Sequence, residues 1–399
     1  MRWLGSFTRR GAGIPLAKVV WIAALLLVAA VAAACTERTT AVQQAASPLE
    51  LSTEIKVAAV WPYSSRPTYF WEGIQLAQEE INAQGGVLGR RVRAIRADDL
   101  SSVTEGMAVA QTLAEDRTLL AVIGHRSSFV ALPASEVYAR AGLIYIAPSA
   151  TTPALTQRGY ARIFRTIPND ASIGRQMAEY VAETGHQRVA IAYTDESYGR
   201  GLAAAFEDAA EARGVRIVDR VAHFGDLSDI RRTLAKWQAF GYDAIFVAAA
   251  SPHMAEIVRL LRLAGATVPI YGGDSFDSQQ LLDIAGPHAE GVVFASVFDI
   301  ENNDPETQRF VAAFRARYGY TPDTWAAQAY DSLHLLADAI DRAGTVDPEA
   351  VSDALRETTR WRGVTGWHTF DASGDVVDKP IVFKTVRNGQ FALLSGRRG

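Results

Sequence analysis

The segment IGHRSSF (Ile123–Phe129) groups a histidine, an arginine and two serines in four consecutive positions. A serine beside a histidine could be a nucleophile with its base, whereas hydroxyl groups beside an arginine could bind an anion without reacting with it. No G-x-S-x-G turn surrounds Ser127 or Ser128, and a histidine adjacent in sequence rarely has the geometry of a general base. We therefore expect a binding site rather than a catalytic one, with His125 in a packing role, and a protein that is not an enzyme.

A second polar loop, APSATTP (Ala147–Pro153), follows the next predicted strand. In an open α/β sheet, ligands bind at the carboxyl ends of the strands, where two such neighbouring loops would meet. Hydroxyl groups and backbone N–H groups at helix starts suit a carboxylate, because several donors converge and the helix dipole assists. Ser128 and Thr151 are the candidate donors, although each could instead be only the N-cap of the helix that follows.

The elements that would hold these loops alternate between strand and helix from Ile55 onward. Nearly continuous apolar runs such as LLAVIG (Leu119–Gly124) are typical of parallel strands that are buried on both faces. The alternation predicts an α/β fold. Two α/β blocks can be distinguished, near Ile55–Thr166 and Ala171–Ser296, and two alternating runs joined by Asn388-Gly389 predict a C-terminal hairpin.

The stretch YGRGLA (Tyr198–Ala203) follows a strand and matches the G-x-G-x-x-A pattern of dinucleotide-binding proteins. That motif needs its first glycine close to the strand end, so that a pyrophosphate reaches the helix N-terminus. Here DESY (Asp195–Tyr198), with two acidic residues, lies in between. We expect neither a nucleotide nor another cofactor. The seven histidines are scattered and the chain has one cysteine, so no metal site is expected either.

The chain has 399 residues and a formal net charge of −4, and its first 34 residues contribute four basic side chains and no acidic one. The remainder is therefore more acidic than the whole and has no basic tract, which argues against nucleic acid as a partner. A chain of this length and composition is long enough for two domains of ordinary size.

The N-terminus has the pattern of a targeting segment. Basic residues precede the apolar run Val19–Ala34, and Cys35, the only cysteine, follows it. VAAAC resembles the lipobox of bacterial lipoproteins, with Ala32 in place of the usual leucine, so we expect residues 1–34 to be a lipoprotein signal peptide and Cys35 to be the lipid anchor. An ordinary signal peptide or an uncleaved anchor is the alternative. Residues 35–54 are small and polar, as in a flexible tether.

Several longer stretches resemble type I periplasmic binding proteins, and within them the leucine/isoleucine/valine-binding branch. In order along the chain they include INAQGGVLGR (Ile81–Arg90), AVIGHRSS (Ala121–Ser128), APSATTPALTQRGYARIFRT (Ala147–Thr166), VAIAYTDESYGRGLA (Val189–Ala203) and IAGPHAEGVVFAS (Ile284–Ser296). The resemblance implies the type I periplasmic-binding fold, in which two Rossmann-like lobes with parallel sheets are joined by a three-segment hinge. The crossovers would lie near residues 168–170, 297–299 and 365–367. Lobe 1 would then comprise residues 55–169 and 298–365, and lobe 2 residues 170–297 and 366–399.

The resemblance also implies roles for individual residues. Ser128 and Thr151 would bind the α-carboxylate of an amino acid. The backbone carbonyl of Ser149 and the side chain of Asp274 would receive the α-ammonium, and Tyr198 would close over the ligand. The other candidate ligand-binding residues in these loops and in the first loop of the chain are Arg126, Ser127, Ala150 and Tyr63.

Three departures from the branch bear on the ligand. Asp274 stands where the best-known branched-chain binders carry glutamate, so its carboxylate reaches one methylene less far. Arg126 replaces an apolar contact; it could bind a second carboxylate, or it could turn to solvent. The first loop, Trp61–Gly73, is short and rich in aromatic residues. Some of Trp61, Tyr63, Tyr69 and Trp71 could line the pocket, or Tyr69 and Trp71 could instead pack the start of the next helix.

The function that the resemblance implies is that of an extracytoplasmic solute-binding lipoprotein of an ABC importer, held at the membrane by its lipid. It would bind an amino acid or a similar small carboxylate by hinge closure and pass it to the membrane permease. Charge partners on both lobes fit this function, because a zwitterion that leaves water needs a partner for each of its charges. With the partners divided between the lobes, closure becomes favourable only when ligand is bound. A ligand sensor of the same fold that signals to a partner protein is the alternative.

Overall fold

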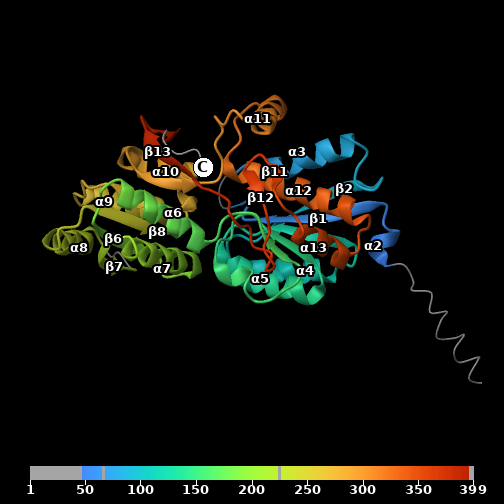
Figure 1. Ribbon diagram of the computed structural model, residues 1–399, viewed down its shortest axis with the longest axis horizontal. Coiled ribbons are helices and arrows are strands. Elements are labelled where there is room, and N and C mark those ends of the chain that lie inside the picture. Colours follow the sequence, from blue (N-terminus) through green and yellow to red (C-terminus); the bar gives the residue numbers. More distant parts are fainter. Residues whose placement is uncertain (1–46, 65–67, 223–225, 395–399) are drawn as a thin grey trace, which may run out of the picture. The chain divides into compact units, whose positions relative to one another are not determined.

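The computed structural model describes residues 47–64, 68–222 and 226–394 (Figure 1). The predicted signal peptide, Cys35 and most of the predicted tether lie outside the described residues. Within the described part, no helix combines the length and the apolar character needed to span a membrane. The short helix α2 (Pro48–Leu51) precedes the first strand.

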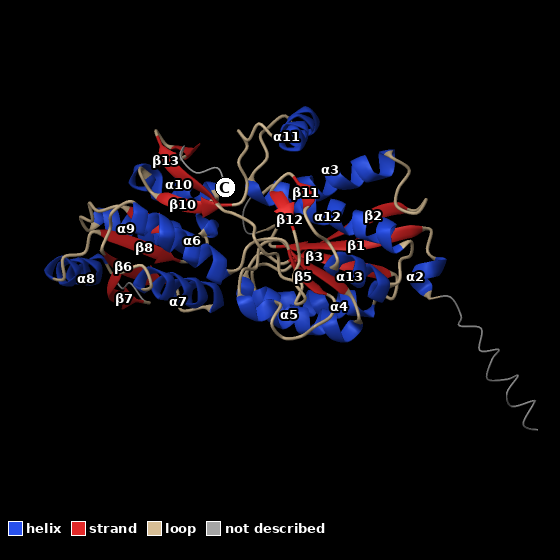
Figure 2. Ribbon diagram, in the orientation of Figure 1, coloured by secondary structure: helices blue, strands red, loops and turns tan. Residues whose placement is uncertain are grey.

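The first sheet has five parallel strands in the order β2-β1-β3-β4-β5 (Figure 2). The strands are β1 (Glu54–Trp61), β2 (Arg91–Asp98), β3 (Leu119–Gly124), β4 (Ile144–Ala147) and β5 (Ile163–Arg165). Every residue of β3 is buried, as its apolar sequence predicts. Alternate residues of β1 face opposite sides, so Val57 belongs to one core and Ala58 to the other.

Helices cover both faces of this sheet, which is why its strands are apolar on both sides (Figure 1). One face packs against α3 (Phe70–Ala83), α11 (Pro305–Tyr318), α12 (Thr324–Ala343) and α13 (Pro348–Arg356). The other face packs against α4 (Val103–Glu115) and α5 (Ser128–Ala141). The two-stranded hairpin of β11 (Trp361–Gly363) and β12 (Gly366–His368) follows α13; neither it nor β5 was predicted.

The second sheet has seven strands in the order β14-β13-β10-β9-β8-β6-β7. Its parallel part consists of β6 (Arg188–Tyr193), β7 (Arg216–Val221), β8 (Ala244–Ala248), β9 (Ile270–Gly272) and β10 (Val293–Ser296). One face is covered by α6 (Asp170–Glu183) and α7 (Ser197–Glu211), and the other by α8 (Leu227–Ala239), α9 (His253–Leu263) and α10 (Gln279–Ala285). The two sheets confirm the predicted type I periplasmic-binding architecture.

The predicted C-terminal hairpin is confirmed. β13 (Val382–Arg387) pairs antiparallel with β10 and with β14 (Gln390–Leu393). Asn388 and Gly389 form the turn with φ of 54° and 72°, the left-handed values that a two-residue hairpin turn of this kind requires.

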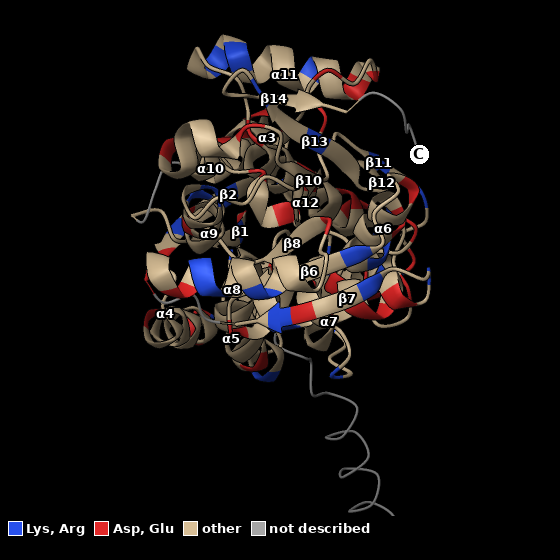
Figure 3. Cartoon of the chain, turned by 90° about the vertical axis from the view of Figure 1, so that its left-hand side faces the viewer, with Lys and Arg blue, Asp and Glu red and all other residues tan. Residues whose placement is uncertain are grey.

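Charged side chains on the outer side of the second sheet form pairs of opposite sign. On β7, Arg220 contacts Glu207 of α7 at 2.8 Å, and Asp219 contacts Lys236 of α8 at 2.9 Å. Figure 3 shows blue (Lys, Arg) and red (Asp, Glu) segments along β7. These pairs are partly exposed, so each contributes little to stability.

The third passage between the two cores lies later in the chain than its predicted position at residues 365–367. Phe370 and Val376 still pack in the core of the first sheet, whereas Ile381 and Phe383 pack in that of the second. Residues 366–376, which we predicted to belong to lobe 2, therefore pack with lobe 1. Within this segment, Asp375 forms a buried ion pair with Arg165 of β5.

Three buried ionisable side chains, Arg165, Asp375 and Lys379, link the first and third connecting segments. The guanidinium of Arg165 binds Asp375, with Nε 2.8 Å from Oδ1, and Asn169 Nδ2 donates to Asp375 Oδ2 at 2.8 Å. Farther along, Lys379 Nζ donates to the Thr166 carbonyl at 3.0 Å and to Thr365 Oγ1 at 2.8 Å. The first and third connecting segments are thus joined by side-chain hydrogen bonds.

Candidate functional site

A cavity at the carboxyl ends of β3, β8 and β9 is lined by residues of both lobes. From lobe 1 it is lined by Arg126, Ser127, Ser128, Phe129, Ser149 and Trp325, and from lobe 2 by Glu196, Tyr198, Ala250, Ser251, Asp274 and Ser275. Six of the nine predicted ligand-binding residues are in this set. The structure thus brings together the two polar loops and the acid that the sequence pointed to.

The lobe 1 wall is built around the N-terminus of α5. Ser127 occupies the N-cap position with extended backbone, but its side chain makes no capping hydrogen bond. Ser128 is the first helical residue and is 3% exposed. Ser149 Oγ donates to the carbonyl of Arg126 at 2.8 Å and thereby ties the two predicted loops together. Hydroxyl groups and first-turn N–H groups thus line one wall, which suits a carboxylate.

The lobe 2 wall carries a buried carboxylate. Asp274 begins a short helical turn directly after β9, and Tyr198 lies in the first turn of α7. Tyr198 Oη donates to Asp274 Oδ1 at 2.9 Å. Burial raises the pKa of Asp274 to about 6, although the Tyr198 hydrogen bond lowers it. A buried carboxylate of this kind gains most from a cation that binds beside it.

Arg126 and Trp325 meet at one side of the cavity. The Arg126 guanidinium carbon lies 5.4 Å from the centre of the Trp325 ring. Burial raises the pKa of Asp323, the N-cap of α12, to about 6, while the positive charge of Arg126 lowers it. Sequence reasoning missed Trp325, because an aromatic residue at a helix start is indistinguishable from a core residue; its one signal was its place directly after a helix-capping Asp323-Thr324.

Three predicted site residues do not line the cavity in the described chain: Thr151, Ala150 and Tyr63. The Tyr63 ring lies 3.9 Å from the Arg96 guanidinium and edge-on to Trp71, and its Oη donates to the Ala59 carbonyl at 3.1 Å. These contacts hold Tyr63 in the packing of lobe 1, away from this cavity.

Thr151 and Ala150 are fully buried behind the lobe 1 wall. The Thr151 carbonyl accepts the N–H of Asp170 at 2.9 Å. Neither Thr151 Oγ1 nor the two Asp170 carboxyl oxygens have a hydrogen-bond partner among the described residues. Burial raises the pKa of Asp170 to about 8, although the nearby Thr151 hydroxyl lowers it. A buried, protonated carboxyl group therefore lies at the first connecting segment, close to the cavity.

His125 lies behind the cavity and has a structural role. Its Nδ1 is 2.7 Å from Asp99 Oδ2, and its Nε2 is 2.9 Å from Tyr138 Oη. The imidazole is completely buried, and both ring nitrogens are occupied, so it is not positioned to act on the serines. This agrees with the packing role expected from the sequence.

The glycines of YGRGLA serve close packing. A Cβ on Gly199 would lie 2.2 Å from the carbonyl oxygen of Thr194. The carboxylate of Glu196 caps α7 and accepts the N–H groups of Tyr198 at 2.8 Å and Gly199 at 2.7 Å. A carboxylate thus occupies the helix N-terminus at which a pyrophosphate would have to bind.

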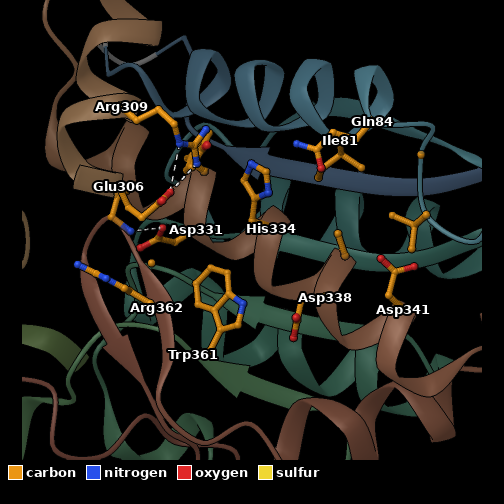
Figure 4. Close-up of a pocket in the computed structure, with 16 residues that line it drawn as sticks. Ile81, Gln84, Glu306, Arg309, Asp331, His334, Asp338, Asp341, Trp361 and Arg362 are labelled. Atoms are coloured by element: carbon orange, nitrogen blue, oxygen red, sulfur yellow. Dashed lines mark hydrogen bonds and ion pairs between the residues drawn. The ribbon is translucent and has the colours of Figure 1, made fainter. Parts of the chain in front are cut away.

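A separate cavity of about 330 Å³ lies in lobe 1 between α3, α12 and the β11–β12 hairpin (Figure 4). Its charged groups are largely matched within the protein. Arg309 Nη2 contacts Glu306 at 2.7 Å, and Asp331 accepts the N–H groups of Val364 at 2.7 Å and Thr365 at 2.8 Å. Within the described chain, no group of three or more acidic, histidine or cysteine side chains could hold a metal ion.

Comparison with known proteins agrees with this geometry. A family model described as "Periplasmic binding protein" matches residues 54–390. A leucine-, isoleucine-, valine-, threonine- and alanine-binding protein of Pseudomonas aeruginosa is 29% identical over 81% of this chain and 87% of that protein.

Two solved structures also resemble the chain over most of its length. An ABC transporter substrate-binding protein of Desulfitobacterium hafniense, in complex with Leu, is 43% identical, with a TM-score of 0.80 over 86% of this chain and all of that one. A branched-chain amino acid transporter substrate binding protein of Streptococcus pneumoniae, in complex with isoleucine, is 30% identical, with a TM-score of 0.77 over 85% of this chain and 97% of that one.

The family consists of solute-binding proteins, which are not enzymes. The two lobes, the order of the matched motifs and the extent of these matches lead to one assignment. The chain belongs to the periplasmic binding protein family, in its branched-chain amino acid ABC transporter substrate-binding branch.

Proposed function

We propose that this protein binds an amino acid, or a similar small carboxylate, between its two lobes and delivers it to the membrane permease of an ABC importer. The observation that carries the proposal is that one wall of the cavity offers hydrogen-bond donors and the other a carboxylate. Hydroxyl and N–H donors around Ser127 and Ser128 line one wall, and the Tyr198–Asp274 pair lines the other. An α-carboxylate and an α-ammonium would each find a partner there.

The division of these partners between the lobes supports a closure mechanism. Without ligand, bringing the lobes together would enclose the Asp274 carboxylate without a cation, which costs free energy. With a zwitterion bound, both charged ends would be matched in the closed form. The ligand would thus shift the population from open to closed, because it interacts with both lobes only in the closed form.

The two solved relatives support an amino acid as the ligand, since one is in complex with Leu and the other with isoleucine. Arg126 lines this cavity, and its positive charge lowers the pKa of Asp323. A second carboxylate on a ligand could therefore bind this guanidinium.

A thermal-shift screen of the purified protein against single amino acids tests the proposal. A ligand present at about a hundred times its dissociation constant adds about 2.7 kcal/mol to the free energy of unfolding, which is a readily measured shift. We expect at least one amino acid to stabilise the protein, and its amide and its N-acetyl derivative to have no effect. Equal stabilisation by the derivatives would contradict a site that matches both charges.

The periplasmic family supports an extracytoplasmic location, and the N-terminal sequence supports a lipid anchor at Cys35. We propose that residues 1–34 are removed and that lipidated Cys35 holds the protein at the membrane through the part of the predicted tether that precedes α2. Cys35→Ser should then release the protein into the soluble fraction of fractionated cells. Membrane association that persists in Cys35→Ser would indicate an uncleaved anchor instead.

A further inference from the structure

The cleft contains a second and larger chamber next to the cavity described above. Its volume is about 410 Å³, within the range of small-molecule pockets. Lobe 1 lines it with Thr68, Tyr69, Phe298, Ile300, Tyr320, Thr321, Pro322, Asp323, Thr324 and Trp325, and lobe 2 with Asp277, Ser278, Gln279, Lys384 and Phe391. Trp325 lines both spaces, so its indole forms the shared wall between them.

Two residues that line this chamber each carry a buried donor with no hydrogen-bond partner among the described residues. The donors are Trp325 Nε1, in a residue that is 3% exposed, and Thr324 Oγ1, in a residue that is 4% exposed. Buried N–H and O–H groups are rarely left without an acceptor, because each loses its hydrogen bonds to water. Both belong to the first turn of α12 at the boundary of the two spaces.

The charged groups of the chamber are already matched by protein atoms. Lys384 Nζ lies 2.9 Å from Asp277 Oδ2. The carboxylate of Asp323 accepts the N–H of Ala326 at 2.8 Å and that of Tyr69 at 3.0 Å. The groups that lack a partner are therefore neutral donors, and seven of the fifteen residues that line the chamber are aromatic or aliphatic.

From this arrangement we infer that the second chamber binds the distal end of the ligand's side chain, an aromatic or similarly long apolar group that ends in a neutral hydrogen-bond acceptor such as a carbonyl. The inference rests on the proposed function, because the amino-acid end would occupy the first cavity. Trp325 would contact the side chain where it passes from one space to the other. The ligand would thus be longer than leucine.

Calorimetric titration with three probes tests this inference: L-leucine, p-acetyl-L-phenylalanine and p-isopropyl-L-phenylalanine. The last two have almost the same shape, but only the acetyl group carries an acceptor. We expect the acetyl compound to bind at least tenfold more tightly than either of the others. Similar affinities for the acetyl and isopropyl compounds would overturn the inferred acceptor contact.

Two variants locate the contact. Thr324→Val should weaken binding of the acetyl compound about fivefold and leave the affinities for leucine and the isopropyl compound unchanged. Ile300→Trp, which fills the chamber, should weaken both aromatic compounds at least tenfold and spare leucine. An Ile300→Trp variant that binds all three as the wild type does would overturn the inference.

The outcomes separate this inference from the proposed function. Binding of leucine with weaker or no binding of both aromatic compounds would overturn the inference alone. Failure of every probe and of every amino acid would overturn the proposed function and the inference together. Binding of the acetyl compound in the absence of leucine binding would support both.

Discussion

The phenolic oxygen of Tyr198 donates a hydrogen bond to the carboxylate of Asp274 over 2.9 Å, and both side chains are buried in lobe 2 at the cleft. Tyr198 comes from the start of α7 and Asp274 from the turn after β9, so the pair joins two loops of the same sheet edge. The hydrogen bond fixes the orientation of the one acid that we assign to the ligand's ammonium.

Removal of this hydrogen bond should weaken ligand binding. For Tyr198→Phe we expect a loss of about 1.5 kcal/mol, or roughly tenfold in Kd, because one hydrogen bond to a charged group is lost. Tyr242→Phe makes the same chemical change in the core of lobe 2, away from the cleft, and should leave Kd unchanged. Titration calorimetry of both variants measures the difference; an equal effect of the two changes would argue against the assignment.

Ligand affinity should fall in acid. Burial raises the pKa of Asp274 to about 6, and only the ionised form can pair with an ammonium group. Affinity should therefore be nearly constant between pH 7 and pH 8 and fall by up to about tenfold per unit below pH 6, as linkage to one proton requires. Kd values measured from pH 5 to pH 8 test this. If Asp274→Asn retains the same pH dependence, another group is responsible.

The stability gained by Asp170→Asn should increase with pH. The folded-state pKa of Asp170 is about 8, above its ordinary value of 3.8, so the native state keeps a proton that the unfolded state releases. Its contribution to stability is complete below pH 4 and is lost as the pH rises towards 8. The negative charges of Asp274 and Glu196 also raise the pKa of Asp170, whereas the positive charge of Arg165 lowers it.

We therefore expect the free energy of unfolding of Asp170→Asn to exceed that of the wild type. The excess should grow between pH 5 and pH 8, to on the order of a few kcal/mol. Urea denaturation at both pH values measures it. Parallel pH profiles for the two proteins would show that Asp170 is not protonated in the native state.

The buried pair of Arg165 and Asp375 should matter far more than an exposed pair. Asp375→Ala leaves a guanidinium buried without its acid, which costs about 3–5 kcal/mol. Asp353→Ala is the matched control, since Asp353 contacts Arg356 at 3.7 Å with its side chain 70% exposed and should cost less than about 1 kcal/mol. Denaturation midpoints of the two variants that coincide would contradict this account of the hinge.

Most of the strands that carry the site could be predicted from the sequence. Parallel strands such as β3 and β8 are buried on both faces, and their sequences are therefore uninterrupted apolar runs. It did not predict the third connection correctly. Residues 366–376 have no periodic pattern of their own, and their position depends on the contact of Asp375 with Arg165, 210 residues earlier. Contacts of that range leave no signal in local sequence.

The site was predicted in part for the same kind of reason. Ser128, Tyr198 and Asp274 each follow a strand in a recognisable motif, and a sheet edge gathers such positions. Trp325 could not be assigned to the site from the sequence, because it belongs to α12, almost 200 residues after the serine loop, and is part of no recognisable motif. Thr151 was predicted to bind the ligand's carboxylate but does not line the cavity, and its buried neighbour Asp170 could not be foreseen from the sequence.

The most direct test of amino-acid binding between the lobes is titration calorimetry of the wild type and Asp274→Asn with the amino acid that gives the largest thermal shift. We expect one site per chain in the wild type and binding at least about a hundredfold weaker in Asp274→Asn, because the ligand's ammonium would be enclosed without its counter-charge. Circular dichroism should show the same fold for both proteins. Equal Kd values for the wild type and a folded Asp274→Asn would contradict this expectation.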